Sequence, residues 1–293
     1  LVDINSQEIT RANAISISPD GQYIAAVNER KSLLIWDIQA NKGQSVMIKD
    51  VIPEMVFSPQ SDYIAVARLP KTYTQFDIKL AVGQVSVYAV NSLKEAKVFS
   101  GYPGLGQIGY SQDGSMLIGG TGDQILVWDI LSGQPIKIST STFAGCRVAY
   151  SAVGAQYLGS VSNNSTFNTW DTGDQMACSQ AGDNLPDYFT VDHLKFINYN
   201  SNRIEAKNTK TSEFLWTYPV LNVTSIYITH DNQWVLVGTS TGDVMIIDMS
   251  NGKRVHLIKT GAAVMNVASS NDMKYIIVNT GINGIKIYGV RSY

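Results

Sequence analysis

Glycines at three positions form the pattern in this chain that most resembles a cofactor-binding motif. Gly104, Gly106 and Gly109 have the GxGxxG spacing of dinucleotide-binding loops. That chemistry needs a helix directly after the glycines, because the helix N-terminus meets the pyrophosphate. In this chain the glycines lead into an expected strand at residues 108–111. We therefore interpret them as a loop and predict no nucleotide cofactor.

The histidines do not form a reactive set with other side chains. His193 and His230 are expected in turns of two different repeats, and His256 on an outer strand. None has the spacing of a metal site. No GxSxG elbow and no Ser-His-Asp set can be assigned either. The sequence therefore predicts no catalytic residue, no metal and no cofactor.

The composition argues against two classes of partner. The 293 residues carry a formal net charge of -2, and 16% of them are charged, against roughly 25% in an average soluble domain. We expect no nucleic-acid partner, because the basic surface that such proteins present is missing. We also expect no membrane span, since no apolar run reaches the about 18 residues that a spanning helix needs.

A strand–turn–strand unit recurs along the chain with a period near 40 residues. Its marker is a tight turn after the first strand, with residues 19, 59, 112, 152, 230 and 270 at the second position. These positions are separated by 40, 53, 40, 78 and 40 residues. The step of 78 indicates a hidden unit with its turn near residues 191–193. The step of 53 indicates an insertion, which we place at residues 69–82.

The clearest unit, at residues 110–129, shows what each repeat contains. Gln112-Asp113-Gly114 and Thr121-Gly122-Asp123 are turn sequences between apolar runs. The third expected strand ends in Trp128-Asp129, and a fourth strand is expected at residues 135–138. Four short antiparallel strands in every unit are typical of a propeller blade.

These features resemble the WD40-repeat family over essentially the whole chain. The turn, the Trp-Asp pair and the period match, whereas the family's Gly-His dipeptide before the first strand is missing from every unit. The fold implied is all-β: one domain, residues 1–293, forming a seven-bladed β-propeller of four-stranded antiparallel blades. The approximate blades are 11–50, 51–100, 104–140, 144–182, 185–219, 222–260 and 262–293 plus 1–10. Without the family's His-centred hydrogen-bond network, we expect blade stability to rest mainly on apolar packing between sheets.

The repeat also places the tryptophans, the cysteines and the N-terminus. Trp36, Trp128 and Trp170 share one repeat position, which predicts that they fill the core between blades. Cys146 and Cys178 are expected on the first and fourth strands of one blade, roughly 14 Å apart at about 4.8 Å per strand. A disulfide needs Cα atoms within about 7 Å, so both are predicted to be free thiols. The last unit has three strands, and we expect residues 1–10 to complete it and close the ring.

The insertion is the strongest candidate for function, because a long loop on a rigid scaffold is where binding residues usually lie. In WD40-like propellers its position between the second and third strands belongs to the top face. Alternation over residues 73–80 favours a lengthened hairpin, and a harmless insertion is the alternative. The candidate partner-binding residues are Lys71, Tyr73, Gln75, Phe76, Asp77 and Lys79 in the insertion, and Tyr102, Phe143 and Tyr188 in other top-face loops.

The preferred interpretation is a non-catalytic protein–protein interaction module or scaffold subunit of a larger assembly. WD40-like propellers commonly bind a peptide or protein surface on the top face. The alternative is an enzyme or small-molecule sensor that uses the mouth of the central channel. Of the residues expected there, Arg11 and Asp183 are charged, and no acid–base pair is evident. The resemblance favours the cytoplasm, while low charge and a start at Leu1 keep an exported or periplasmic protein open.

Overall fold

The described part of the chain is built almost entirely from antiparallel strands. The computed structural model describes residues 2–4, 12–28, 32–49, 51–68, 82–103, 108–111, 113–121, 124–140, 147–150, 157–161, 167–171, 188–190, 194–200, 202–208, 211 and 213–289. One short 3-10 helix, η2 (Gly281–Asn283), interrupts the strands of this part. No helix among these residues has the length and apolar character that a membrane crossing requires.

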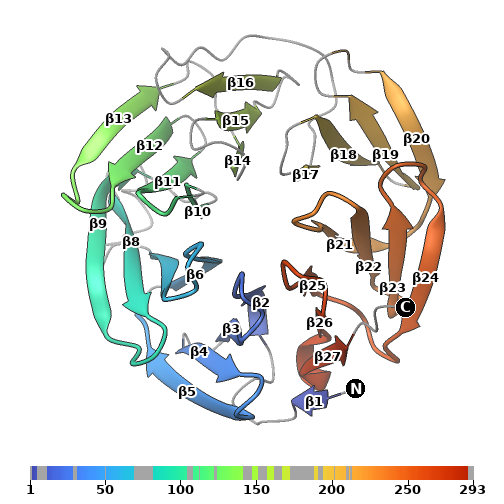
Figure 1. Ribbon diagram of the computed structural model, residues 1–293, viewed down its shortest axis with the longest axis horizontal. Helices are drawn as coiled ribbons and strands as arrows, with labels where there is room; N and C mark the ends of the chain where they lie inside the picture. The colour runs from blue at the N-terminus through green and yellow to red at the C-terminus, as the bar shows by residue number, and fades with distance from the viewer. Residues whose placement is uncertain are drawn as a thin grey trace, which may run out of the picture. The chain divides into compact units, whose positions relative to one another are not determined.

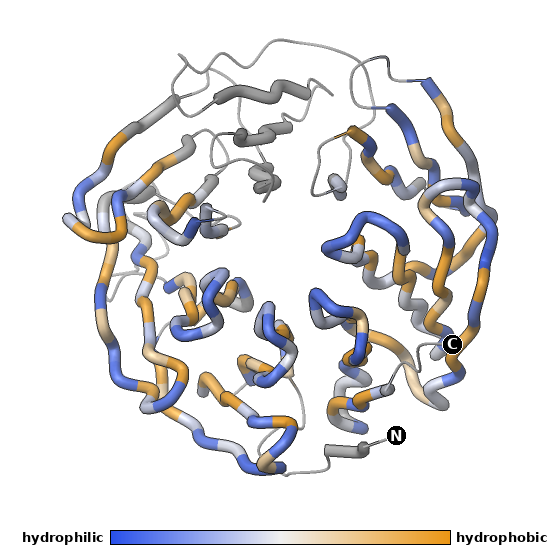
Figure 2. The backbone as a smooth tube through the Cα atoms, in the orientation of Figure 1, coloured by the Kyte–Doolittle hydropathy of each residue, from blue (hydrophilic) through white to orange (hydrophobic). Residues whose placement is uncertain are grey.

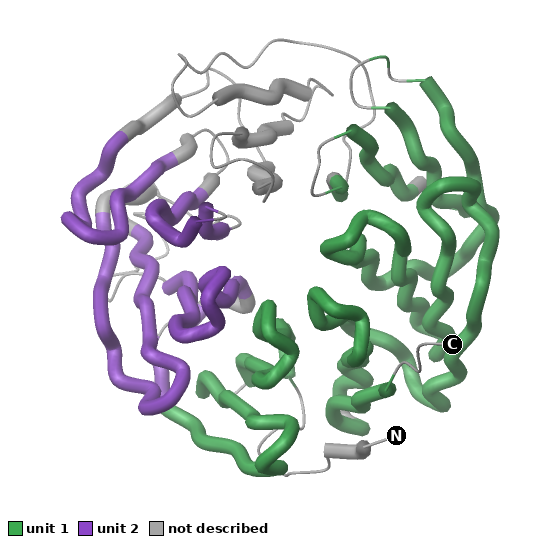
Figure 3. The backbone as a smooth tube through the Cα atoms, viewed as in Figure 1, with its two compact units in different colours: residues 1–46, 186–293 green, residues 47–185 purple. Residues whose placement is uncertain are grey.

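The strands group into separate sheets, and the chain divides into two compact units (Figures 1 and 3). Each sheet consists of strands consecutive in the chain, except that the N-terminal strand joins the last sheet. Unit 1 comprises residues 1–46 and 186–293, and unit 2 comprises residues 47–185. The all-β class and the repeated four-stranded antiparallel sheet are confirmed. Repeated units of this kind fit a repeat protein such as a β-propeller.

Unit 1 contains four sheets, and within each sheet neighbouring strands are hydrogen-bonded. The first sheet consists of β2 (Ala12–Ile17), β3 (Tyr23–Asn28), β4 (Ser32–Asp37) and β5 (Lys42–Met47), and the second of β17 (Tyr188–Phe189), β18 (Lys195–Asn200), β19 (Arg203–Asn208) and β20 (Phe214–Pro219). The third sheet consists of β21 (Val223–Ile228), β22 (Trp234–Thr239), β23 (Asp243–Asp248) and β24 (Arg254–Lys259). The fourth consists of β1 (Val2–Ile4), β27 (Ile285–Gly289), β26 (Tyr275–Asn279) and β25 (Asn266–Ser269). The sheet of β17–β20 is the hidden unit that the step of 78 residues predicts.

Unit 2 contains three further sheets among its described residues. They are β6 (Val51–Phe57), β7 (Tyr63–Arg68), β8 (Val82–Ala89) and β9 (Glu95–Pro103), then β10 (Ile108–Tyr110), β11 (Met116–Thr121), β12 (Gln124–Asp129) and β13 (Pro135–Thr140), and finally β14 (Arg147–Tyr150), β15 (Tyr157–Val161) and β16 (Phe167–Asp171). The predicted insertion does join the second and third strands of its sheet, because β7 ends at Arg68 and β8 begins at Val82.

Burial follows the position of a strand within its sheet. The second and third strands are buried over most of their length, as in β22 and β23, whereas the outer strand β24 is exposed. Middle strands that are covered on both faces read as continuous apolar runs. Figure 2 shows this pattern, with hydrophobic residues concentrated on the strands and hydrophilic ones at many of the turns.

The sheets of unit 1 pack face to face through a series of apolar clusters. One cluster joins Ile204 and Trp216 of β17–β20 to Val235 and Ile247 of β21–β24. A second joins β21–β24 to the sheet of β25–β27, and a third joins that sheet to β2–β5. The first strands β17, β21, β25 and β2 contact one another in that order. Unit 1 is therefore a row of sheets with their first strands side by side.

In unit 2, Trp128 lies in the core between two sheets, as its repeat position predicts. It is 1% exposed and packs with Phe99 of the preceding sheet, with ring centroids 5.8 Å apart and an interplanar angle of 53°. In unit 1, Trp36 is partly buried against the cluster that joins the first and last sheets. The side chain of Trp170 lies outside the described residues.

The N-terminal strand supplies the fourth strand of the last sheet, as predicted. β1 pairs antiparallel with β27, with Val2 opposite Ile287 and Ile4 opposite Ile285. The pairing covers Val2–Ile4 of the predicted segment 1–10, and residues 5–10 lie outside the described part.

A hydrogen-bond network that is not among the sequence-based expectations recurs in the turns after the first strands. In each case a buried hydroxyl donates to an aspartate at 2.5–2.7 Å and accepts the backbone N–H five residues later at 2.8–3.1 Å. The hydroxyls belong to Ser18, Ser58, Ser111, Thr229 and Ser270. Thr190 accepts the N–H of Lys195 in the same way at 3.0 Å. Local polar networks thus support the sheets together with the expected apolar packing.

The aspartate of the Trp-Asp pair has a structural role in the following turn. Asp129 accepts the N–H of Ser132 at 2.6 Å, and Asp37 accepts the N–H of Ala40 at 2.8 Å. Asp248, which follows Ile247, accepts the N–H of Ser250 at 2.7 Å. A carboxylate that bonds the backbone two or three residues later mimics a backbone turn and favours the reversal. The repeated Asp is thereby explained by turn formation between the third and fourth strands.

Candidate functional site

Strand direction sorts the connections of unit 1 onto two edges. Because successive strands are antiparallel, links between second and third strands fall on the same edge as links between successive sheets. We call this the loop edge, and its described connections are residues 202, 220–222, 240–242, 260–265 and 280–284. The opposite edge, which we call the turn edge, carries the Ser/Thr–Asp turns at residues 18–22, 229–233 and 270–274.

The loop edge exposes uncharged residues, including two large apolar side chains. Leu221 is 62% exposed and Met265 is 52% exposed. Their exposed neighbours in the same connections are small or amide-bearing residues: Asn222, Ser240, Thr241, Gly261, Ala263 and Asn283. The turn edge instead exposes His230, Asp231, Asp272 and Lys274. The two edges thus differ in chemistry, and the described connections of the loop edge are free of charge.

Hydrogen bonds connect the loop-edge backbones of neighbouring sheets. The N–H of Ser240 donates to the carbonyl of Asn222 at 2.9 Å. The hydroxyl of Thr224 donates to the carbonyl of Val264 at 2.6 Å, and the N–H of Val264 donates to the carbonyl of Thr239 at 3.0 Å. Val264 itself is fully buried. The connections that carry Leu221 and Met265 are therefore tied to one another.

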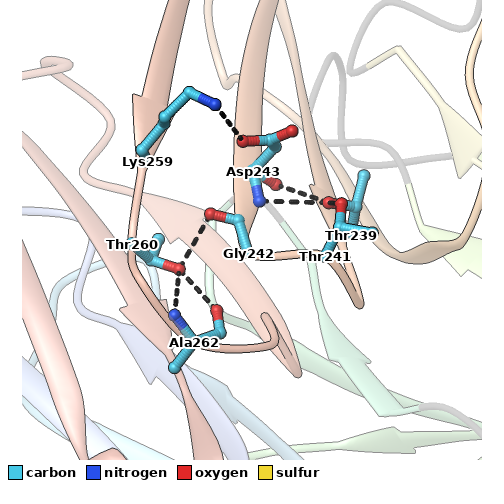
Figure 4. A network of polar contacts seen from close by, with 7 residues as sticks. All are labelled: Thr239, Thr241, Gly242, Asp243, Lys259, Thr260 and Ala262. Atoms are coloured by element: carbon cyan, nitrogen blue, oxygen red, sulfur yellow. Dashed lines mark hydrogen bonds and ion pairs between the residues drawn. The ribbon is translucent and has the colours of Figure 1, made fainter.

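Two buried threonines organise the centre of this edge (Figure 4). The hydroxyl of Thr260 lies 2.9 Å from the carbonyl oxygen of Gly242 and 2.5 Å from that of Ala262. The hydroxyl of Thr239 accepts the N–H of Asp243 at 3.1 Å and lies 2.9 Å from the hydroxyl of Thr241. These bonds pin the 240–242 connection against the 260–265 connection.

The ion pair beside this network contributes little to it. The Nζ of Lys259 lies 3.9 Å from Oδ1 of Asp243, and the lysine side chain is 79% exposed. Exposed pairs of this kind contribute about 0–1 kcal/mol, because water screens the charges and long side chains lose entropy. The rigidity of the loop edge therefore comes from the threonine and backbone hydrogen bonds.

The hydrogen bonds continue from Met265 to the first sheet. The N–H of Met265 donates to the carbonyl of Asn279 at 2.7 Å. The buried amide of Asn279 donates to the carbonyl of Ala12 at 2.8 Å, and its Oδ1 accepts the N–H of Gly281 at 2.9 Å. The loop edge is thus held by bonds across three sheets of unit 1. The position of its backbone is thereby set by hydrogen bonds within unit 1.

The structure describes only part of the predicted partner-binding set. Lys71, Tyr73, Gln75, Phe76, Asp77, Lys79 and Phe143 lie outside the described residues. Tyr102 does not lie in a loop as expected, because the outer strand β9 extends to Pro103 and Tyr102 pairs with Gly83 of β8. Tyr188 lies on β17, where it is half-buried against the cluster that joins β17–β20 to β21–β24.

The two exposed apolar residues of the loop edge, Leu221 and Met265, are not in the set predicted from the sequence. In the sequence, each of these residues is a large apolar side chain in a loop of uncharged residues. This pattern does not predict exposure, since Val220 and Val264 in the same loops are buried. Both neighbours are apolar, and only packing separates the buried from the exposed residue.

Groups that could carry out chemistry are sparse in the described residues. His230 lies in a turn and His256 on the outer strand β24, as expected, and both are exposed. His193, Cys146 and Cys178 lie outside the described part. No cluster of three or more His, Cys, Asp or Glu residues that could hold a metal ion occurs within the described ranges. Glu54 on the inner strand β6 is half-buried, and burial raises the pKa of its carboxyl.

Comparison with known proteins does not assign the chain to a family. No protein-family model matches the sequence, and no curated protein matches it closely enough to be a relative.

Proposed function

We propose that this protein is a non-catalytic protein–protein interaction module or scaffold subunit, which binds a peptide or protein surface through the loop edge. The observation that carries the proposal is that the described loop-edge connections of unit 1 contain no charged residue and expose Leu221 and Met265 on a hydrogen-bonded backbone. The centres of protein interfaces are depleted in charged residues and enriched in Met and aromatic residues. A backbone that is ordered in advance also lowers the entropy lost on binding.

We further propose that the sheets are the blades of a seven-bladed propeller of the WD40 type, closed by the N-terminal strand. The repeat spacing, the recurring four-stranded sheets and the β1–β27 pairing support this architecture. Closing a ring in this way removes the long free edges that an open row of sheets would have.

The insertion between β7 and β8 is proposed to add contacts to the same partner. It belongs to the loop connections of its own sheet, because it links a second strand to a third. Tyr73 and Phe76 would be its anchors, since buried aromatic residues are enriched among residues that dominate binding energy. Truncating both to alanine should leave the melting temperature unchanged and weaken binding.

The test is capture of partners from the native source, followed by affinity measurements with one purified partner. The double variant L221D/M265D should weaken binding at least roughly 30-fold, because two anchors that each contribute more than about 1 kcal/mol are lost and each 1.4 kcal/mol is tenfold. The matched control is L131D/L194D, which makes the same change at exposed leucines in turn connections. Equal affinity for the two double variants, with both proteins folded, would refute the loop-edge assignment.

The alternative function, an enzyme or small-molecule sensor at the mouth of a central channel, is favoured by one observation. Glu54 is a half-buried carboxyl on an inner strand with a raised pKa, as residues at binding sites often are. A ligand-induced rise in melting temperature that is lost in the Glu54→Gln variant would support this alternative over the loop edge.

A further inference from the structure

Two Asn-Gly pairs, Asn251-Gly252 and Asn283-Gly284, give the chain a chemistry of its own, and both lie in its described part. In such a pair the backbone nitrogen of the glycine attacks Cγ of the asparagine, because glycine has no Cβ to hinder the approach. The side-chain amide group leaves with the glycine N–H proton as ammonia, and a succinimide ring forms. Water then opens the ring at either carbonyl, which leaves aspartate or isoaspartate. Each event replaces a neutral amide with a carboxylate.

The fold opposes this reaction at Asn251. The side-chain Nδ2 of Asn251 donates to Oδ2 of Asp248 at 2.8 Å, and its Oδ1 accepts the N–H of Lys253 at 2.8 Å. The N–H of Gly252 donates to the carbonyl of Asp248 at 2.8 Å. A Cβ on Gly252 would approach the indole of Trp216 to 2.7 Å, so this glycine is tightly packed. Ring closure at Asn251 therefore requires local opening of the turn.

Asn283 is held much less firmly. Its side chain is exposed and makes no hydrogen bond to another described residue. It ends η2, a single 3-10 turn without a side-chain cap. The N–H of Asn283 donates to the carbonyl of Thr280 over 3.4 Å, and that of Gly284 to the carbonyl of Gly281 at 3.0 Å. Hydrogen bonds in 3-10 turns have poorer geometry than those in α-helices, so this turn should open at lower cost.

Opening of this turn need not disturb the strand that follows it. The carbonyl of Gly284 accepts the N–H of Thr280 at 2.9 Å and its hydroxyl at 2.8 Å. These bonds anchor the start of β27 outside the three residues of η2. The reaction at Asn283 therefore requires rotation of a free side chain and adjustment of one short turn.

A carboxylate at position 283 would lie in the connection that neighbours Met265. A Cβ on Gly281 would lie 3.5 Å from Cγ of Met265, and the N–H of Met265 donates to the carbonyl of Asn279 at 2.7 Å. The described connections of the loop edge contain no charged residue, so this carboxylate would be their first charge. Charged residues are depleted at the centres of interfaces, because an unpaired charge is costly to remove from water.

We propose that Asn283 is a self-modification site, whose spontaneous deamidation places a negative charge on the loop edge and weakens partner binding there. The effect on binding rests on the proposed function of the loop edge, whereas the reaction itself does not. The reaction needs water and no other reactant. The contrast with Asn251 is set by the fold, because the two pairs have the same local chemistry in the unfolded chain.

Peptide mapping by mass spectrometry tests the reaction on the folded full chain, kept in mildly alkaline buffer. Asn283 should convert to isoaspartate and aspartate at least roughly tenfold faster than Asn251, a ratio that corresponds to about 1.4 kcal/mol of local opening. In urea the two rates should become similar. Asp248→Ala removes a partner of Asn251 and should raise the rate at Asn251 alone. Equal rates at the two sites in the folded protein, or an intact Asn283 after the urea sample has reacted, would overturn the proposal.

Affinity for the captured partner tests the effect of the charge. Asn283→Asp should weaken binding at least roughly tenfold, or about 1.4 kcal/mol. The control Asn283→Gln keeps a neutral amide and should bind as the unmodified protein does, and melting curves establish that both variants are folded. Unchanged affinity for Asn283→Asp, beside a weakened L221D/M265D, would overturn the effect on binding and leave the proposed function standing. Normal binding by L221D/M265D as well would refute the proposed function and this effect together.

Discussion

The buried side-chain amide of Asn279 donates to the backbone carbonyl of Ala12 across 2.8 Å, joining positions 267 residues apart in the chain. The same amide group also lies 3.2 Å from Oδ1 of Asn266, and Oδ1 of Asn279 accepts the N–H of Gly281. This one side chain therefore links the last sheet of unit 1 to the first strand of the first sheet. Together with the β1–β27 pairing, it connects the two ends of the sequence.

Replacing Asn279 with alanine should lower the free energy of unfolding by about 1–3 kcal/mol. The cost arises because the carbonyl of Ala12 loses its partner in a buried position and the N–H of Gly281 loses its partner in a partly buried one. Urea denaturation measures the change. Asn251→Ala is the control, because Asn251 makes side-chain hydrogen bonds in an exposed turn and its loss should cost less. Equal losses for the two variants would contradict the bridging role.

Removing residues 1–10 should destabilise unit 1 as a whole and not fray one end. The deletion strips the partner strand from β27, whose Ile285 and Ile287 are buried in the cluster between the last and first sheets. Exposing such side chains costs about 25 cal/mol for each Å² of apolar surface. A thermal melt followed by circular dichroism should show a lower midpoint. An unchanged melting curve would show that the N-terminal strand does not stabilise unit 1.

Gly242→Ala should destabilise the protein more than Gly261→Ala, although both glycines have positive φ. Gly242 has φ +89°, and a Cβ there would lie 2.8 Å from the carbonyl oxygen of Ala262. Gly261 has φ +76°, but a Cβ would meet nothing within 4 Å. Both variants lose roughly 1–2 kcal/mol to the left-handed conformation. The difference between the losses of unfolding free energy in the two variants measures the cost of the clash between residue 242 and the backbone of Ala262. Equal losses would show that the loop edge can shift to avoid the clash at little cost in free energy.

The sequence predicts the repeated elements well, because turns and apolar strands are local features. Asp113-Gly114 of the predicted turn lies between β10 and β11, and the hidden unit follows from spacing alone. The Ser/Thr–Asp turn network is also within reach of the sequence, since Ser270 and Asp272 are two residues apart and their pattern recurs. The extension of β9 to include Tyr102 is not, because it depends on pairing with the lengthened β8.

The candidate site is less predictable because it depends on contacts between distant segments. Nothing in the local sequence of Asn279 indicates that it bonds Ala12, since the contact exists only when the last and first sheets pack together. The exposure of Met265 beside buried Val264 has the same origin. The local sequence thus determines which segments form the strands of each sheet. Which side chains are exposed on the loop edge depends on how the sheets pack together.

Acid should weaken the protein through the turn aspartates, with Asp272 the clearest case. Partial burial raises the pKa of this carboxyl, but hydrogen bonds from Lys274 and Ser270 outweigh burial and lower the pKa from 3.8 to about 2. The Nζ of Lys274 lies 2.7 Å from Oδ2, and the hydroxyl of Ser270 donates to Oδ1 at 2.7 Å. A carboxyl with a lowered pKa in the folded state binds its proton more readily in the unfolded chain.

The stabilising contribution of Asp272 is therefore complete above pH 3.8 and is lost as the pH falls from 3.8 to about 2. Urea midpoints measured between neutral pH and pH 2 should fall for the unmodified protein. In Asp272→Asn the fall across this window should be smaller, because the variant has no proton to take up at this position. The pKa values of Asp113, Asp129 and Asp248 are lowered as well, so some acid sensitivity should remain. An identical acid profile in the variant would mean that Asp272 is equally solvated in both states, and the turn network would then have no part in acid stability.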